Sequence, residues 1–201
     1  ATVLAFLVLA VLWRRARPWH TRLTRQRVLR LARVTGLLAA GMPAATFLAN
    51  LVPWWRWSPP SFVLVALLSV LVLGITGVLA AVCLNGPWSS SALGPLAAMS
   101  AITASVIGLD LLTGSSLQIS SIFGLQPLVG GRFYGMGNVA FALYGSAVLL
   151  LCAAMAHALF RRDAPRLAAL AVVLIGGIAL AVDVLPAWGA DFGGPISLVP
   201  A

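Results

Sequence analysis

The sequence predicts an all-α protein, a polytopic bundle of about six to seven transmembrane helices with a re-entrant or interfacial Gly-rich segment on its outer side. Three observations predict this class. Hydrophobic residues make up 61% of the 201 residues and charged residues only 8%, whereas soluble domains keep roughly a quarter of their residues charged. The apolar residues form continuous runs, and about 20 such residues cross a bilayer. These runs lack the polar–apolar alternation of barrel strands.

The apolar runs place the spans in order along the chain. They lie near residues 34–52, 62–84, 92–112, 138–160 and 167–184, with the tail of an earlier span at 1–13 and the start of another near 193. Helices are expected because lipid offers no partner for free backbone groups. Gly74, Gly77 and Gly108 are predicted to let helices approach closely. The chain opens and closes within apolar runs, so we expect 1–201 to be a single transmembrane region of a longer protein.

The orientation follows from arginine, which supplies all 13 basic residues. Eight of them lie between residues 14 and 33, and three more lie at Arg161, Arg162 and Arg166. Both groups fall on the same side of the membrane, and the positive-inside rule makes that side cytoplasmic. We therefore expect a plasma-membrane protein with both arginine groups in cytoplasmic loops, whose partner is the lipid bilayer. The charge of +9 is assigned to these loops and not to nucleic-acid binding.

Three of the four acidic residues fall on the opposite, outer side. Asp163 belongs to the cytoplasmic loop, but Asp110 and Asp183 lie near the outer ends of their spans, and Asp191 follows in the outer loop. Ionisable residues within membrane spans are functional candidates by default. These three aspartates are the candidate catalytic residues. His20 and His157 stand alone and are not on this side, so a Ser–His–Asp set and a histidine-ligated zinc are not expected.

A long outer segment, 113–137, is too polar and Gly-rich to span the membrane and too apolar to lie free in water. It contains Gln118 and ends in the run from Gly130 to Asn138, which includes Arg132 and Tyr134. Arginine and Gly-rich backbone can hold a phosphate or carboxylate. Gln118, Arg132, Tyr134 and Asn138 are the candidate substrate-binding residues. The run lacks the Gly-Lys-Ser/Thr of a Walker loop and the preceding strand of a dinucleotide site.

A second cluster runs from Asp183 to Pro195. Here Asp191 has a structural alternative, the cap of a following helix with Pro195 in its first turn. For Asp110 and Asp183 the structural alternative is an ion pair with Arg132. Carboxylates and an amide also suit a hard divalent cation, which is the cofactor that this set would accept. The metal itself stays unknown. Cys83 and Cys152 lie in apolar runs without metal-ligand spacing.

The residues Gly131-Arg132-Phe133-Tyr134-Gly135-Met136-Gly137-Asn138, with Trp188-Gly189-Ala190-Asp191-Phe192-Gly193-Gly194 downstream, resemble a group of uncharacterised polytopic bacterial membrane proteins of actinobacterial type. That group shows a GRF/Y-x-G-x-GN motif and a later G-x-D-F/V-GG motif. The resemblance covers roughly residues 105 to 195. It implies membrane placement and a pairing of the two motifs, and it implies no reaction. Val139 stands where many relatives carry an acid.

Three functions remain open from the sequence. The first is a membrane-embedded enzyme that acts on a lipid-linked or anionic substrate of the cell envelope, with a carboxylate as base or metal ligand. The second is a transporter or flippase, because broken helices with Gly and Pro beside polar residues form substrate sites in transporters. The third is a structural or assembly subunit of an envelope complex.

Sided labelling tests the orientation. Single cysteines at Gln126, Trp188 and Ser90, in a Cys83→Ala/Cys152→Ala background, are treated with an impermeant thiol reagent in intact cells. Positions 126 and 188 should react, whereas position 90 should react only after permeabilisation. Labelling of 126 and 188 from opposite sides would show that the two motifs do not share a face. Labelling of position 90 alone would invert the orientation.

Overall fold

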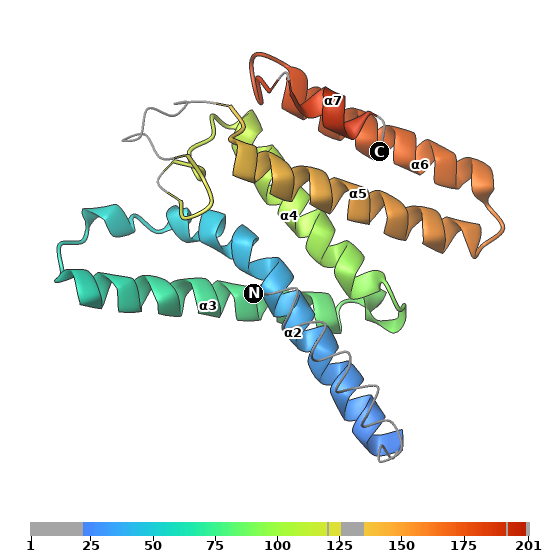
Figure 1. Ribbon diagram of the computed structural model, residues 1–201, viewed down its shortest axis with the longest axis horizontal. Helices are drawn as coiled ribbons and strands as arrows, with labels where there is room; N and C mark the ends of the chain where they lie inside the picture. The colour runs from blue at the N-terminus through green and yellow to red at the C-terminus, as the bar shows by residue number, and fades with distance from the viewer. Residues whose placement is uncertain (1–21, 120, 126–134, 192, 200–201) are drawn as a thin grey trace. The chain divides into compact units, whose positions relative to one another are not determined.

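The structure is a computed structural model that describes residues 22–119, 121–125, 135–191 and 193–199 (Figure 1). The chain divides into two compact units, Ala1–Gly36 and Leu37–Ala201. Within the described residues, five helices are long and apolar enough to cross a membrane. Five helices of this length and composition are compatible with a multi-pass membrane protein. The predicted span at 1–13 lies outside the described residues, and the helix α7, Gly194–Leu198, has five residues.

The five long helices occupy the predicted spans. They are α2 (Arg22–Leu48), α3 (Ser61–Asn85), α4 (Gly94–Leu112), α5 (Asn138–Phe160) and α6 (Pro165–Val184). Short 3-10 helices η2 (Ala49–Leu51), η3 (Trp54–Arg56) and η4 (Pro87–Ser90) lie in the connections. The helix α2 begins at Arg22, before the predicted start of the second span near residue 34. Apolar residues mark the part of a helix that enters lipid, and polar turns can precede it.

Proline and glycine set several helix boundaries. Pro60 precedes α3, and Gly86 ends it. Pro95 and Pro165 lie in the first turns of α4 and α6, where a missing N–H leaves no hydrogen bond unmade. Inside α2, Pro43 lacks the N–H that would bond four residues back.

In the second unit, α5 packs between α4 and α6 (Figure 1). Tyr144 of α5 joins all three helices. Its ring faces Gly108 of α4, where an added Cβ would lie 3.4 Å from Cε2. Its hydroxyl donates to the carbonyl oxygen of Ala179 in α6, at 3.4 Å. Around Tyr144 lies a core cluster that includes Phe47, Ile107, Leu111, Met136 and Val182.

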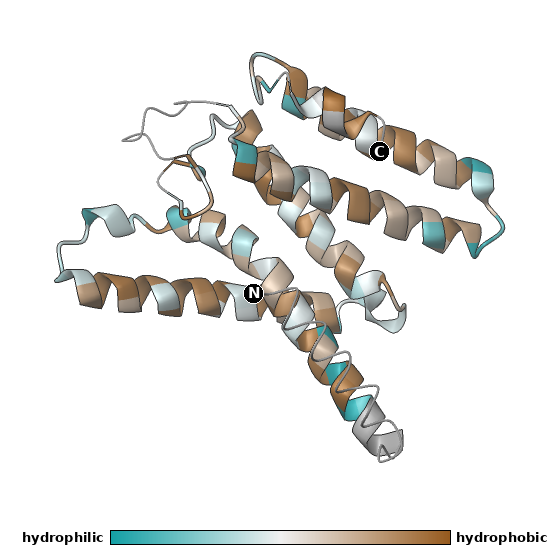
Figure 2. Ribbon diagram, viewed as in Figure 1, coloured by the Kyte–Doolittle hydropathy of each residue, from teal (hydrophilic) through white to brown (hydrophobic). Residues whose placement is uncertain are grey.

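The helix α3 exposes most of its apolar surface. Figure 2 shows hydrophobic residues along the long helices and hydrophilic residues gathered at turns and near the start of α2. Only 11% of the most apolar window of α3 is buried. A side chain at Gly74 or Gly77 would meet no atom within 4 Å in the described part of the chain. The predicted packing role of these two glycines is therefore wrong within these residues, whereas that of Gly108 is confirmed.

The contrast between Gly108 and Gly77 gives a matched test of helix packing. Gly108→Leu should lower the free energy of unfolding by about 1–3 kcal/mol, because a larger side chain there must displace the ring of Tyr144. Gly77→Leu makes the same chemical change on an exposed face and should shift it by less than about 1 kcal/mol. Unfolding in detergent, followed by circular dichroism, measures both. Equal losses in the two variants would contradict the packing described.

Candidate functional site

Two Gly-rich segments that are far apart in the sequence meet at one end of the second unit. The backbone N–H of Met136, just before α5, donates to the carbonyl oxygen of Gly189, just after α6, at 2.8 Å. Gly135 has a φ of +79°, which favours glycine. A side chain there would also overlap the Gly189 carbonyl. The described parts of both motifs therefore lie side by side.

Asp183 lies at this meeting point, in the last turn of α6. Its side chain is 0% exposed. Neither carboxylate oxygen makes a hydrogen bond within the part of the chain that the structure describes. A buried charge without a partner is costly, and buried polar side chains are nearly always hydrogen-bonded. Asp183 therefore stands apart from an ordinary structural aspartate.

Two glycine residues pack against Asp183. A side chain at Gly194 would overlap the Asp183 carboxylate, and one at Gly189 would overlap its backbone carbonyl. That carbonyl accepts the N–H of Asp191 at 3.1 Å. Tyr144 and Asp191 lie near enough to interact electrostatically with the Asp183 carboxylate. Gly194 therefore lies directly against the carboxylate, and Gly189 lies against the backbone of the same residue.

Asp191 supports the turn before α7. Its Oδ1 accepts the backbone N–H of Gly193 at 3.1 Å, which is an Asx turn. The following residue, Gly194, begins α7. This contact resembles the capping role that the sequence offered as the alternative to catalysis. Asp191 itself is partly exposed.

Asp110 holds the backbone that leaves α4. Its Oδ1 accepts the N–H of Leu117 at 2.7 Å, and its Oδ2 accepts the N–H of Gln118 at 3.2 Å. The side chain is 2% exposed. Short bonds from N–H groups to a carboxylate are among the stronger hydrogen bonds in proteins. Both oxygens of Asp110 are therefore engaged in shaping the loop.

Asn50 is a site residue that the sequence reasoning missed. Its amide nitrogen donates to the carbonyls of Leu117 and Ile119, at 2.9 and 3.0 Å, while its oxygen accepts the Trp54 indole N–H at 2.8 Å. The available signal was an amide side chain at the outer end of an apolar run. Tyr144 was missed as well, and its signal was a hydroxyl inside an apolar span.

Gln118 is another buried polar side chain. It is 0% exposed. Its amide makes no hydrogen bond of ordinary length within the described residues, but it lies beside the Asp110 carboxylate and interacts with it. Its backbone carbonyl accepts the N–H of Leu125 at 2.7 Å. Gln118 therefore differs from Asp183, because its amide has the Asp110 carboxylate beside it.

The other candidates are less closely defined. Asn138 is exposed at the first position of α5. Arg132 and Tyr134 lie outside the described residues, so their contacts with an anion or with an aspartate stay predictions. Among the residues described, no three His, Cys, Asp or Glu side chains are grouped to hold a metal ion.

Neutralising Asp110 tests its structural role. Asp110→Asn replaces one accepting oxygen by an NH₂ group and removes the charge from two hydrogen bonds. We expect a loss of about 1–3 kcal/mol of stability and faster amide hydrogen exchange at Leu117 and Gln118. Asp163→Asn, the same change on an exposed turn residue, is the control. Unchanged exchange at both amides would show that the carboxylate does not hold this loop.

No protein-family model, curated protein sequence or solved structure matches this chain.

Proposed function

We propose that this multi-pass membrane protein is an enzyme that acts on an anionic or lipid-linked substrate of the cell envelope, at the end of the bundle that holds Asp183. The observation that carries the proposal is the Asp183 carboxylate, which is fully buried and lacks a hydrogen-bond partner within the described residues. Such groups cluster at sites where a proton or a charge is handled. The arginine distribution supports placing this end on the non-cytoplasmic face.

Asp183 acts in this proposal as a general base or as a ligand of a bound cation. Asp110 and Asp191 have structural roles, because their carboxylates accept backbone N–H groups of neighbouring turns. Gly194 lies against the carboxylate, so the substrate reaches Asp183 only where this contact opens. Gln118 supplies a further buried amide, and Arg132 is the predicted contact for the anionic group.

A transporter is the second candidate, and one observation favours it. Ser100 and Thr103 of α4 are buried, and their spacing places them on the same face of the helix as Asp110. A polar row of this kind, running toward the other end of a span, is expected along an ion or substrate path.

The third alternative, a structural or assembly subunit, is supported by Asp110 and Asp191, because their carboxylates form hydrogen bonds that hold turns in place.

Asp183→Asn separates function from structure. If Asp183 does chemistry, the variant should lose turnover by at least roughly a hundredfold. It should keep or gain thermal stability, because no described hydrogen bond is removed and an unpartnered buried charge disappears. Purified protein is reconstituted into vesicles of actinobacterial lipid extract, and lipid species are followed by mass spectrometry. Vesicles loaded with a pH-sensitive dye report ion flux in parallel.

Asp163→Asn is the matched control and should behave as wild type in every assay. If Asp183→Asn turns over a lipid at the wild-type rate, the enzyme proposal is contradicted. Dye-reported flux that requires Asp183, with no lipid altered, would favour the transporter. A large loss of thermal stability in Asp183→Asn would assign the carboxylate to structure.

A further inference from the structure

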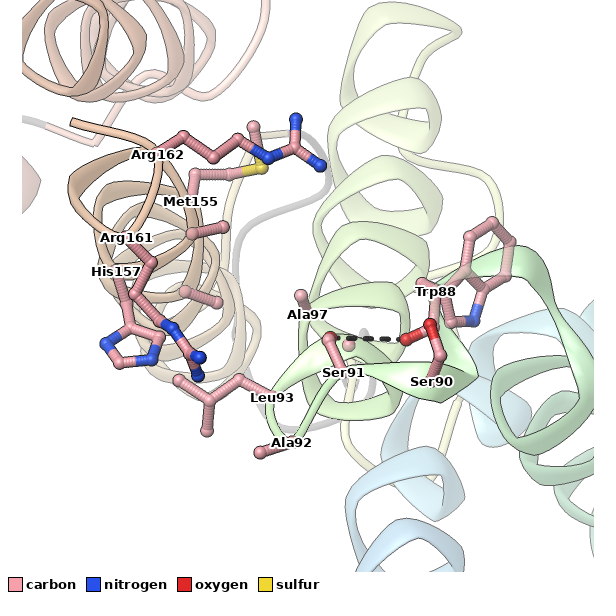
Figure 3. Close-up of a pocket in the computed structure, with 13 residues that line it drawn as sticks. Trp88, Ser90, Ser91, Ala92, Leu93, Ala97, Met155, His157, Arg161 and Arg162 are labelled. Atoms are coloured by element: carbon pink, nitrogen blue, oxygen red, sulfur yellow. Dashed lines mark hydrogen bonds between the residues drawn. The ribbon is translucent and has the colours of Figure 1, made fainter. Parts of the chain in front are cut away.

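A pocket of about 540 Å³ lies at the other end of α4 and α5, away from Asp183 (Figure 3). One wall comes from η4 and the start of α4, with Ser90, Ser91 and Leu93. The other comes from the end of α5 and the turn after it. The helix α4 has 19 residues and so separates this pocket from Asp110 by about 25 Å. The volume is in the range of small-molecule sites.

The pocket is basic. Arg161, Arg162 and His157 line it, and none of its lining residues is acidic. Figure 3 shows Arg161 and Arg162 extending from the end of α5 toward the wall that η4 and α4 form. Neither guanidinium group has a hydrogen bond or ion pair within the described part of the chain. Two planar donor groups are thus free to bind an anion, and guanidinium groups match phosphate geometry.

Further features of the opposite wall favour a phosphate. Ser90 and Ser91 bring hydroxyl groups to the pocket, although the Ser91 hydroxyl also donates to the Trp88 carbonyl at 3.2 Å. The helix α4 begins at Gly94 within this wall. The N-terminal end of a helix carries a partial positive charge, which adds to that of the arginines.

Apolar side chains complete the lining and indicate a lipid. Leu93, Ala97, Met155 and Ala158 lie among the polar groups. A soluble anion would leave this apolar surface unused, whereas the glycerol and acyl parts of a lipid would cover it. The pocket also lies between the ends of two membrane-spanning helices, and basic pockets at such positions bind anionic head groups.

We propose that this pocket binds the phosphate group of an anionic membrane lipid, with Arg161 and Arg162 as its contacts and the apolar wall beside its glycerol and acyl parts. The site is independent of the function proposed for Asp183. Exposed positive charge is not confined to this pocket, because Arg27 and Arg30 are also exposed but do not line it. What distinguishes Arg161 and Arg162 is that they line a pocket.

The test is a titration of the purified chain in neutral detergent, followed by native mass spectrometry. The probes are phosphatidylglycerol, phosphatidylcholine and inorganic phosphate. Arg161→Gln/Arg162→Gln should weaken phosphatidylglycerol binding by roughly thirtyfold, from about 1 kcal/mol for each arginine. Ala97→Leu, which fills the pocket without a change of charge, should weaken it as well. Arg27→Gln/Arg30→Gln removes the same charge elsewhere and should change it by less than about threefold.

Preference for phosphatidylglycerol over phosphatidylcholine, lost in both pocket variants and kept in the charge control, supports the site. An equal loss in Arg27→Gln/Arg30→Gln would overturn it in favour of general charge attraction. Full binding by Ala97→Leu would show that lipid does not enter the pocket. Displacement of phosphatidylglycerol by an equal concentration of inorganic phosphate would overturn the lipid as the source of the phosphate group. Helical content of each variant, from circular dichroism, confirms folding.

Discussion

The irregular backbone that leaves α4 has to satisfy its polar groups, and the arrangement at this end of the molecule depends on how it does so. Asp110 accepts two N–H groups of the turn, and Asn50 donates to two of its carbonyls. An irregular backbone at membrane depth is tolerated only where protein or a wet cavity covers it. These two side chains bind four backbone groups of the loop, and Asn50 ties η2, which follows α2, to the loop after α4. Phe47, Ile107 and Leu111 then pack beneath it.

Two buried aspartates at this end differ in their surroundings, and that difference decides how each is interpreted. Asp110 has a backbone donor for each oxygen, so its charge is balanced by the loop that it shapes. Asp183 lies against two glycines and near Tyr144 and Asp191, and neither of its oxygens has a hydrogen-bond donor among the described residues. Stability alone would favour an apolar residue at that position. A carboxylate kept there at a cost to stability is therefore the stronger candidate for chemistry.

The sequence was most informative about the position and length of the apolar helices, because crossing lipid requires both. The apolar runs predicted the five long helices within a few residues, except for the polar start of α2, because each run must be both long and helical. It was least informative about which face of each helix turns inward. A helix that is apolar all round carries no such signal, so Gly74 and Gly77 looked like Gly108, and the roles of Asn50 and Tyr144 were missed. The burial of Asp183 beside Gly194 likewise depends on a contact between distant segments.

The bond between Met136 and Gly189 has a consequence for biosynthesis. Its two partners lie on either side of α5 and α6, so it can form only after both helices have been synthesised and inserted. The turn held by Asp110 is local, and it can close as soon as residues 117 and 118 emerge. The nascent protein should therefore complete one polar cluster early and carry Asp183 uncovered until Gly189 and Gly194 have followed it. During that interval the carboxylate is exposed to whatever assists membrane insertion.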